Sequence, residues 1–200
     1  MIDAPASARL VEAFANTVDV ELGTDELDTA SKLSAWLTAQ ELLDRGRRVT
    51  AEDHALCLRL RAGIREELGA NVGDAADPAH LTAADEALRA LPVFVTVGSG
   101  GSGGSGGSVG SAGRTGALTP DPALTPVRRA LASIAVAWSE LVVTGEAARL
   151  KRCAEHACAW VFWDVSKNRS RRWCSMRVCG NRNKARRYAA RQTATTTTRP

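Results

Sequence analysis

Aromatic residues, long apolar runs and thiols outside one segment are scarce in this chain. Only 4% of its 200 residues are aromatic. No apolar run approaches the roughly 20 residues that a membrane-spanning helix requires, and the N-terminus lacks the basic stretch and apolar core of a signal peptide. We therefore expect a cytoplasmic protein without membrane contact. There, closely paired cysteines more often bind metal or do redox work than form disulfides.

Groupings typical of catalysis are also missing from the N-terminal part of the chain. It contains no Ser/His/Asp set, no phosphate-binding loop and no cluster of histidines and carboxylates that would hold a catalytic metal. His54 and His80 are isolated from other candidate catalytic residues. We therefore do not expect an enzyme.

Charge is plentiful but unevenly divided. Residues 145–200 contain 14 Lys/Arg and 3 Asp/Glu, a net +11, whereas residues 1–144 carry a net −7. This polarity predicts an acidic body and a basic C-terminal part that meets a polyanion. A solvated surface rich in arginine would give the same pattern.

Most of residues 1–145 show helical periodicity. The expected helices cover Leu10–Val18, Leu33–Leu43, Leu56–Leu68 and Val127–Val142, with a short one from Thr82 to Leu91. Thr50, Thr82 and Thr125 are helix start signals, the last because a proline follows it. Gly145 is a stop signal. The body is therefore predicted to be mainly α-helical.

Two segments depart from this helical pattern. Val93–Val97 is rich in β-branched residues and predicts a short strand. The Gly/Ser-rich residues 98–113 that follow are either a flexible linker or the tip of a hairpin. At the other end of the chain, residues 193–200 are of low complexity, and we expect them to be disordered.

Four of the five cysteines form two pairs with equal internal spacing. Cys153 and Cys158 are separated by four residues, as are Cys174 and Cys179, and 15 residues lie between the pairs. Two such pairs predict one tetrahedral zinc site with four thiolate ligands. Redox thiols and an iron–sulfur cluster are the alternatives. Four thiolates leave no coordination position for water or substrate, so the Zn²⁺ is predicted to be structural.

The other residues near this pattern have plainer interpretations. His156 lies between two of the cysteines and could in principle replace a ligand, but we interpret it as a surface residue of the knuckle loop. Cys57 is predicted to be a core residue of the third helix. Asp164 is predicted to cap the turn at Ser166 or to pair with Arg172. We expect Trp163 and Trp173 to be core residues of the small zinc-binding part.

The segment around the cysteines predicts a treble-clef-like finger: a knuckle, a hairpin, a second knuckle and a helix. The hairpin is expected to pair Trp160–Val165 with Arg171–Trp173. Cations recur every three to four residues in the helix, which suits contact with phosphates. The candidate nucleic-acid contacts are Arg169, Arg171, Arg182, Lys184, Arg186, Arg187 and Arg191. Asn181 and Arg182 would either read bases or fix the geometry of the helix start.

Several fixed elements of this stretch make it recognisable. Besides both cysteine pairs, they are Asp164-x-Ser166-x-Asn168, the run Arg172–Met176, and Cys179-Gly180-Asn181-Arg182. The stretch resembles the CGNR zinc-finger family. Upstream, Leu10–Asp19 and the segment DELDTASKLSAWL resemble the start of an ABATE domain, a mostly helical module linked to stress-induced transcription.

The resemblance implies a domain organisation and a function. It places an ABATE-like domain at 1–145, a CGNR-type finger at 146–192 and a tail at 193–200. It also implies a hairpin in the middle of the chain. The implied function is a zinc-dependent, DNA-binding transcriptional regulator whose N-terminal domain senses a signal or mediates association. A protein-interaction module with an acidic partner and an RNA-binding protein are the alternatives, and a homodimer would strengthen either nucleic-acid reading.

Overall fold

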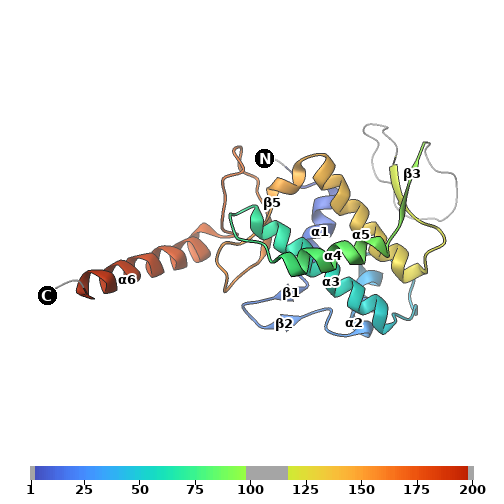
Figure 1. The fold of residues 1–200 in the computed structure, drawn as a ribbon, viewed down its shortest axis with the longest axis horizontal. Helices are drawn as coiled ribbons and strands as arrows, with labels where there is room; N and C mark the ends of the chain where they lie inside the picture. The colour runs from blue at the N-terminus through green and yellow to red at the C-terminus, as the bar shows by residue number, and fades with distance from the viewer. Residues whose placement is uncertain (1–2, 98–116, 198–200) are drawn as a thin grey trace.

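The computed structural model describes residues 3–97 and 117–197 of the chain. As predicted, these residues are mainly helical, with six α-helices and three two-stranded antiparallel sheets. The elements are α1 (Ala6–Ala15), β1 (Val18–Asp19), β2 (Thr24–Asp25), α2 (Ala30–Ala39), α3 (Ala51–Ala70), α4 (Pro78–Arg89), β3 (Val93–Thr96), β4 (Ala117–Pro120), α5 (Pro126–Val143), the 3-10 helix η1 (Glu146–Arg149), β5 (Leu150–Arg152), β6 (Val161–Trp163), the π-helical turn η2 (Met176–Gly180) and α6 (Asn181–Thr197). Figure 1 shows α1 to α5 gathered in one body, from which α6 projects.

The start signals of the two longest body helices are confirmed. The hydroxyls of Thr50 and Thr125 cap α3 and α5. The predicted start of α4 at Thr82 is wrong, because the helix begins at Pro78 and Asp77 caps it. An N-cap acceptor followed by proline is the same signal that correctly marks α5.

The first predicted helix is too long. α1 ends at Ala15, and Val18 instead pairs with Asp25 in the β1–β2 hairpin. Thr17 donates its hydroxyl hydrogen to the Phe14 carbonyl at 2.8 Å, which takes up a carbonyl near the end of the helix. α2 also ends early, at Ala39, and Glu41 just beyond it adopts a positive φ of 58°.

The hydrophobic core is formed mainly by α1, α3 and α5. Its largest fully buried side chains include Phe14, Leu60 and Leu131. The same core continues past the last body helix, because Leu150 of β5 and Val161 of β6 are both fully buried within it. The helical body and the C-terminal segment therefore share one core.

The β3–β4 pair confirms the hairpin expected in the middle of the chain. Its register runs from Val93 opposite Pro120 to Thr96 opposite Ala117. Because these strands are antiparallel neighbours, the segment between them joins adjacent strand ends, which favours a hairpin over a linker between separate parts. The Gly/Ser-rich residues 98–113 themselves lie outside the described residues.

Two predictions for the C-terminal segment are wrong. β6 pairs with β5, in the register Leu150 opposite Trp163, and not with residues 171–173. The latter instead bond to side chains and to the first knuckle, with Ala154 N–H donating to the Arg172 carbonyl at 2.9 Å. α6 continues to Thr197, within the segment that we expected to be disordered. In the described part of the chain, no helix is both long enough and apolar enough to cross a bilayer.

Candidate metal centre and nucleic-acid interface

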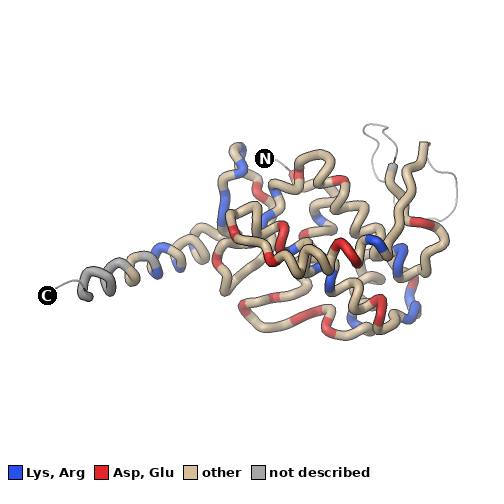
Figure 2. The backbone as a smooth tube through the Cα atoms, in the orientation of Figure 1, with Lys and Arg blue, Asp and Glu red and all other residues tan. Residues whose placement is uncertain are grey.

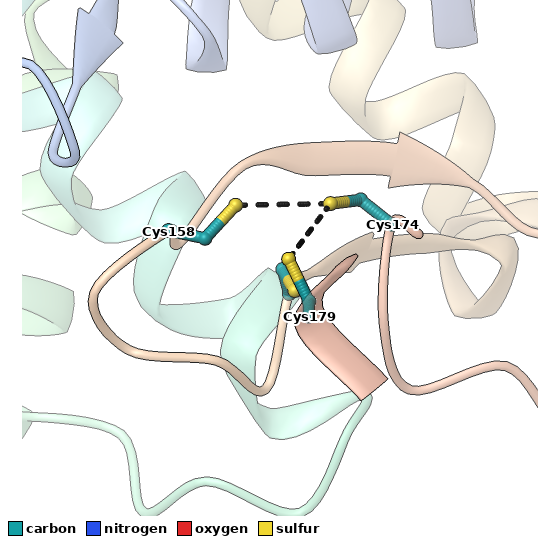
Figure 3. Close-up of side chains that lie close together, drawn as sticks. Cys158, Cys174 and Cys179 are labelled. Carbon is teal, nitrogen blue, oxygen red and sulfur yellow. Dashed lines mark hydrogen bonds between the residues drawn. The ribbon is translucent and has the colours of Figure 1, made fainter. Parts of the chain in front are cut away.

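The four paired cysteines converge on one point. The sulfur atoms of Cys153, Cys158, Cys174 and Cys179 all lie within 4.8 Å of one another. Cys174 Sγ lies 3.7 Å from Cys158 Sγ and 3.6 Å from Cys179 Sγ. Figure 3 draws these three side chains turned toward one another. Disulfide-bonded sulfurs would be about 2.05 Å apart. A tetrahedral Zn²⁺ with Zn–S bonds of about 2.3 Å holds its sulfurs about 3.8 Å apart. The four cysteines are therefore positioned to bind one zinc ion.

The first pair of ligands sits at the tip of the β5–β6 hairpin. Cys153 follows β5 directly, and its N–H donates to the Trp160 carbonyl at 2.8 Å. The Glu155 carbonyl then accepts two N–H groups, from Cys158 and Ala159, each at 2.8 Å. Ala159 completes the turn with a φ of 49°, a conformation that few residues other than glycine adopt. These bonds fold the four intervening residues into a knuckle that presents both sulfurs to one side.

The second pair belongs to the turn that starts α6. The Ser175 hydroxyl accepts the Val178 N–H at 3.3 Å, and the Ser175 carbonyl accepts the Gly180 N–H at 3.1 Å. A β-carbon on Gly180 would lie 2.8 Å from the Met176 sulfur, so only glycine fits here without a shift. One knuckle in a hairpin and one at the start of a helix give a treble-clef-like finger, as predicted, except that the hairpin carries the first knuckle and does not follow it.

Apolar side chains surround the sulfurs. Phe162 and Trp173 pack against the cysteine cluster, and Cys153 is fully buried. Burial, reinforced by the neighbouring thiols, raises the pKa of Cys174, and burial raises the pKa of Cys179 to about 11. Thiols in such a place give up their protons only to a cation that replaces them, since coordination deprotonates a thiol outright. The chemistry of the donor set therefore fits a bound divalent metal.

This centre is anionic when zinc is bound, and one arginine contacts the backbone beside it. Four thiolates and one Zn²⁺ carry two net negative charges, so zinc binding lowers the formal charge of residues 145–200 from +11 to +9. Arg171 donates to the Cys174 carbonyl at 2.6 Å, and its guanidinium lies 4.9 Å from the centre of the Phe162 ring. Arg171 is thus part of the wall of the metal site.

An ion pair between a buried carboxylate and an exposed guanidinium joins the first knuckle to α6. The Glu155 side chain is fully buried and accepts hydrogen bonds from both terminal nitrogens of Arg186, with Nη1 at 2.8 Å from Oε1. The hydrogen bonds from Arg186 lower the pKa of Glu155. Arg186 therefore fixes the direction in which α6 leaves the finger.

A second ion pair, which is buried, shapes the loop between β6 and the second knuckle. Lys151 Nζ lies 2.8 Å from Asp164 Oδ2 and also donates to the carbonyls of Arg169 and Arg171. The other Asp164 oxygen accepts the Ser166 N–H at 2.9 Å, which confirms the predicted cap of that turn. The partner of Asp164 is Lys151 and not Arg172. Lys151 was not anticipated, because a lysine in a strand gives no sequence signal of burial.

Several polar side chains join the finger to the helical body. The side-chain amide of Asn16 accepts a hydrogen bond from the Val161 N–H at 2.8 Å and donates one to the Val161 carbonyl at 2.9 Å. It thus bonds to β6 as the backbone of a neighbouring strand would. Asn71 donates to the carbonyls of Ala147 and Leu150. Arg65 donates to the Ala159 carbonyl, and Arg152 of β5 pairs with Glu66 at 2.7 Å.

Several of the predicted nucleic-acid contacts have partners within the protein. Besides Arg171 and Arg186, Arg182 pairs with Glu21 of the β1–β2 hairpin at 2.8 Å. Arg169 donates to the Gly145 carbonyl at 3.1 Å. Lys184 is exposed, and no hydrogen bond or ion pair of its side chain is found among the described residues. Arg187 and Arg191 lie in α6, but their side chains lie outside the described part of the structure.

Three cations that were not among the candidates resemble Lys184 in their exposure and in their lack of partners among the described residues. Lys167, Arg172 and Arg177 are exposed, and within the described residues none of their side chains has a hydrogen bond or ion pair. Figure 2 shows positive charge on the loop before α6 and along α6, and negative charge around β1 and β2. Nothing in the spacing of the cations distinguishes these three from Arg169 and Arg171, which were predicted and have partners within the protein.

His156, Cys57 and the tryptophans lie where their structural interpretations place them. His156 is 79% exposed and lies 3.3 Å from Asp74, outside the sulfur cluster. Cys57 is fully buried in the body, where desolvation raises the pKa of its thiol to about 12. Trp163 lies in the main core and Trp173 against the metal site, whereas Trp160 is 39% exposed.

Comparison with known families agrees with this architecture. Residues 149–192 match the CGNR zinc finger, and residues 8–145 match ABATE, described as a putative stress-induced transcription regulator. Both are regulator or zinc-finger families and not enzyme families. No curated protein matches the chain. The geometry of the sulfur cluster and the two matched segments together show that this chain belongs to the ABATE family and carries a C-terminal CGNR zinc finger.

Proposed function

We propose that this protein is a zinc-dependent DNA-binding transcriptional regulator. The observation that carries this proposal is the basic helix α6, which the metal centre and the Glu155–Arg186 pair hold in one direction away from the body. The helix contains no Asp or Glu. A positive rod anchored at one end suits contact with a phosphate backbone.

In this proposal the metal has a structural role. Two of its ligands form the turn from which α6 begins, so zinc defines the first residues of the helix. No coordination position remains for a substrate once four thiolates are bound. Loss of zinc would therefore disorient the helix and weaken binding without removing any phosphate contact directly.

The acidic charge of the body supports separate roles for the helical body and the finger. The negative charge around β1 and β2 repels a polyanion, so DNA would contact the finger and leave the helical body free. In this proposal the body senses a signal or mediates association, and the finger contacts DNA. RNA is the second candidate, since a basic helix alone does not separate the two nucleic acids.

A salt series tests the proposal. Full-length zinc-loaded protein is titrated against a fluorescent random-sequence DNA duplex at several salt concentrations, before and after chelation. Contacts by the unpaired cations predict that log K falls with log salt at a slope of about −3 to −4. Chelation should weaken the binding. A protein that shows no DNA affinity at low salt, or tighter binding to an RNA duplex of the same sequence, would contradict the proposal.

A further inference from the structure

The turn between the last two zinc ligands exposes apolar side chains beside a cation. Met176 is 54% exposed and Val178 is 46% exposed. Arg177 between them is also exposed, with no hydrogen bond or ion pair of its side chain among the described residues. We call Met176, Arg177 and Val178 the knuckle tip.

The backbone of the knuckle tip is held in place on both sides. Cys174 and Cys179, whose sulfurs lie 3.6 Å apart, flank it as two ligands of the same metal (Figure 3). Asn181 donates its side-chain amide to the Arg177 carbonyl at 2.9 Å. The Asn-Arg part of the CGNR motif therefore has structural partners, since Arg182 pairs with Glu21. The exposed side chains of the tip project from a fixed backbone.

α6 has two functionally different sides. Arg182 and Arg186 are four residues apart, on the side that contacts Glu21 and Glu155. Lys184 lies two residues from each, which places it about 200° around the helix axis, on the opposite side. A polyanion that avoids Glu21 and the acidic β1–β2 hairpin would meet Lys184 and would reach the start of the helix, where the knuckle tip lies.

We propose that the knuckle tip reads DNA bases, while Lys184 contacts the phosphate backbone. This inference rests on the proposed function. Phosphates supply no partner for Met176 and Val178, whereas a step that contains thymine and guanine places a methyl group next to the acceptors of guanine in the major groove. An exposed arginine with an exposed apolar residue on either side of it in the sequence suits such a step, because arginine binds guanine O6 and N7 with two parallel hydrogen bonds. Phosphate contacts set position, and the knuckle tip supplies specificity.

Selection from a random-sequence duplex library tests the assignment. It is run with the wild-type chain, Arg177→Ala, Arg177→Lys and Lys184→Ala, each shown by metal analysis and circular dichroism to hold one zinc and to fold. We expect the wild type to enrich a motif that contains a guanine. Arg177→Ala should lose preference at that position by about tenfold or more. Arg177→Lys should also lose it, because lysine keeps the charge without the planar fork.

The phosphate contact has a different expected signature. Lys184→Ala should enrich the same motif, bind every duplex more weakly to a similar degree, and reduce the salt slope by about 1. A wild-type chain that binds duplexes in a salt-dependent way but enriches no motif, or an Arg177→Ala chain that keeps the full motif, overturns the assignment and leaves DNA binding intact. A wild-type chain that binds no duplex overturns the proposed function as well.

Discussion

The buried carboxylate of Glu155 and the guanidinium of Arg186 join two zinc ligand segments that are far apart in the sequence. Glu155 lies between Cys153 and Cys158, and Arg186 lies in the helix that follows Cys179. The pair thus braces the metal centre from outside its ligand shell. Such outer partners are often nearly as important for metal retention as the ligands.

Replacing Glu155 should therefore loosen the metal. We expect Glu155→Ala to speed zinc transfer to a chromogenic chelator about tenfold. The exposed Glu86 on α4 offers a matched control, and Glu86→Ala should leave the transfer rate unchanged. Equal transfer rates for the wild type and Glu155→Ala would show that the pair does not support the centre.

Metal analysis distinguishes the four ligands from the fifth cysteine. Wild-type protein purified under reducing conditions should hold one zinc per chain. Cys174→Ser should hold almost none and should lose the helicity of α6, because structural zinc sites supply about 10–16 kcal/mol of binding free energy. Cys57→Ala, in the body core, should keep its zinc. Full zinc content in Cys174→Ser would rule out the four-thiolate site.

The buried Asp164 should make stability depend on pH. Burial alone would raise the pKa of Asp164, but hydrogen bonds from Lys151, Ser166 and Arg171 outweigh it and lower the pKa to about 2. A carboxyl whose pKa is lowered by folding stabilises the protein above its unfolded pKa, near 4, and loses that contribution as the pH falls toward 2. The shift corresponds to about 2 kcal/mol.

Urea unfolding of the wild type and Asp164→Asn measures this contribution. At pH 7 the variant should be less stable by at least about 2 kcal/mol, since Lys151 also loses its buried counter-charge. The gap should stay constant from pH 7 to pH 5 and begin to narrow below about pH 4. A gap that is already closing between pH 7 and pH 5 would contradict the lowered pKa.

The amide of Asn16 should be needed to hold the finger against the body. Asn16→Ala leaves the N–H and the carbonyl of Val161 without their partners, which should cost about 2 kcal/mol of stability. Amide hydrogen exchange at Val161 should accelerate in the variant. Asn168→Ala, at an exposed position of the loop, should change neither quantity. Unchanged exchange at Val161 in Asn16→Ala would mean that other contacts suffice.

The features that could be predicted from the sequence are those encoded locally. Equal cysteine spacing identified all four ligands, because a knuckle needs only its own few residues. Thr50 and Thr125 mark helix starts because a cap acts on the next three residues. The β3–β4 hairpin followed from the family resemblance and not from the residues of the second strand.

The features that were missed depend on contacts between distant residues. β6 pairs with β5, which precedes the first cysteine. The partner strand that was predicted, Arg171–Trp173, lies between the two cysteine pairs. Nothing in the sequence near Arg186 shows that its charge is matched by a buried Glu155. Regular spacing on a helix predicts that cations share a face, but not which face is turned toward the protein.

The shared core has a consequence for how this finger could be transplanted. Leu150 and Val161 complete the interior of the helical body, and Asn16 and Asn71 of that body bond to the backbone of β6 and β5. A chimera that moved the finger to another protein at the boundary of the two matched segments would remove Leu150 and Val161 from the core of the helical body. The transplanted finger would also lose its hydrogen bonds with Asn16 and Asn71. We expect the two segments to be engineered as one piece, because a junction after β6 would instead separate Cys153 and Cys158 from Cys174 and Cys179.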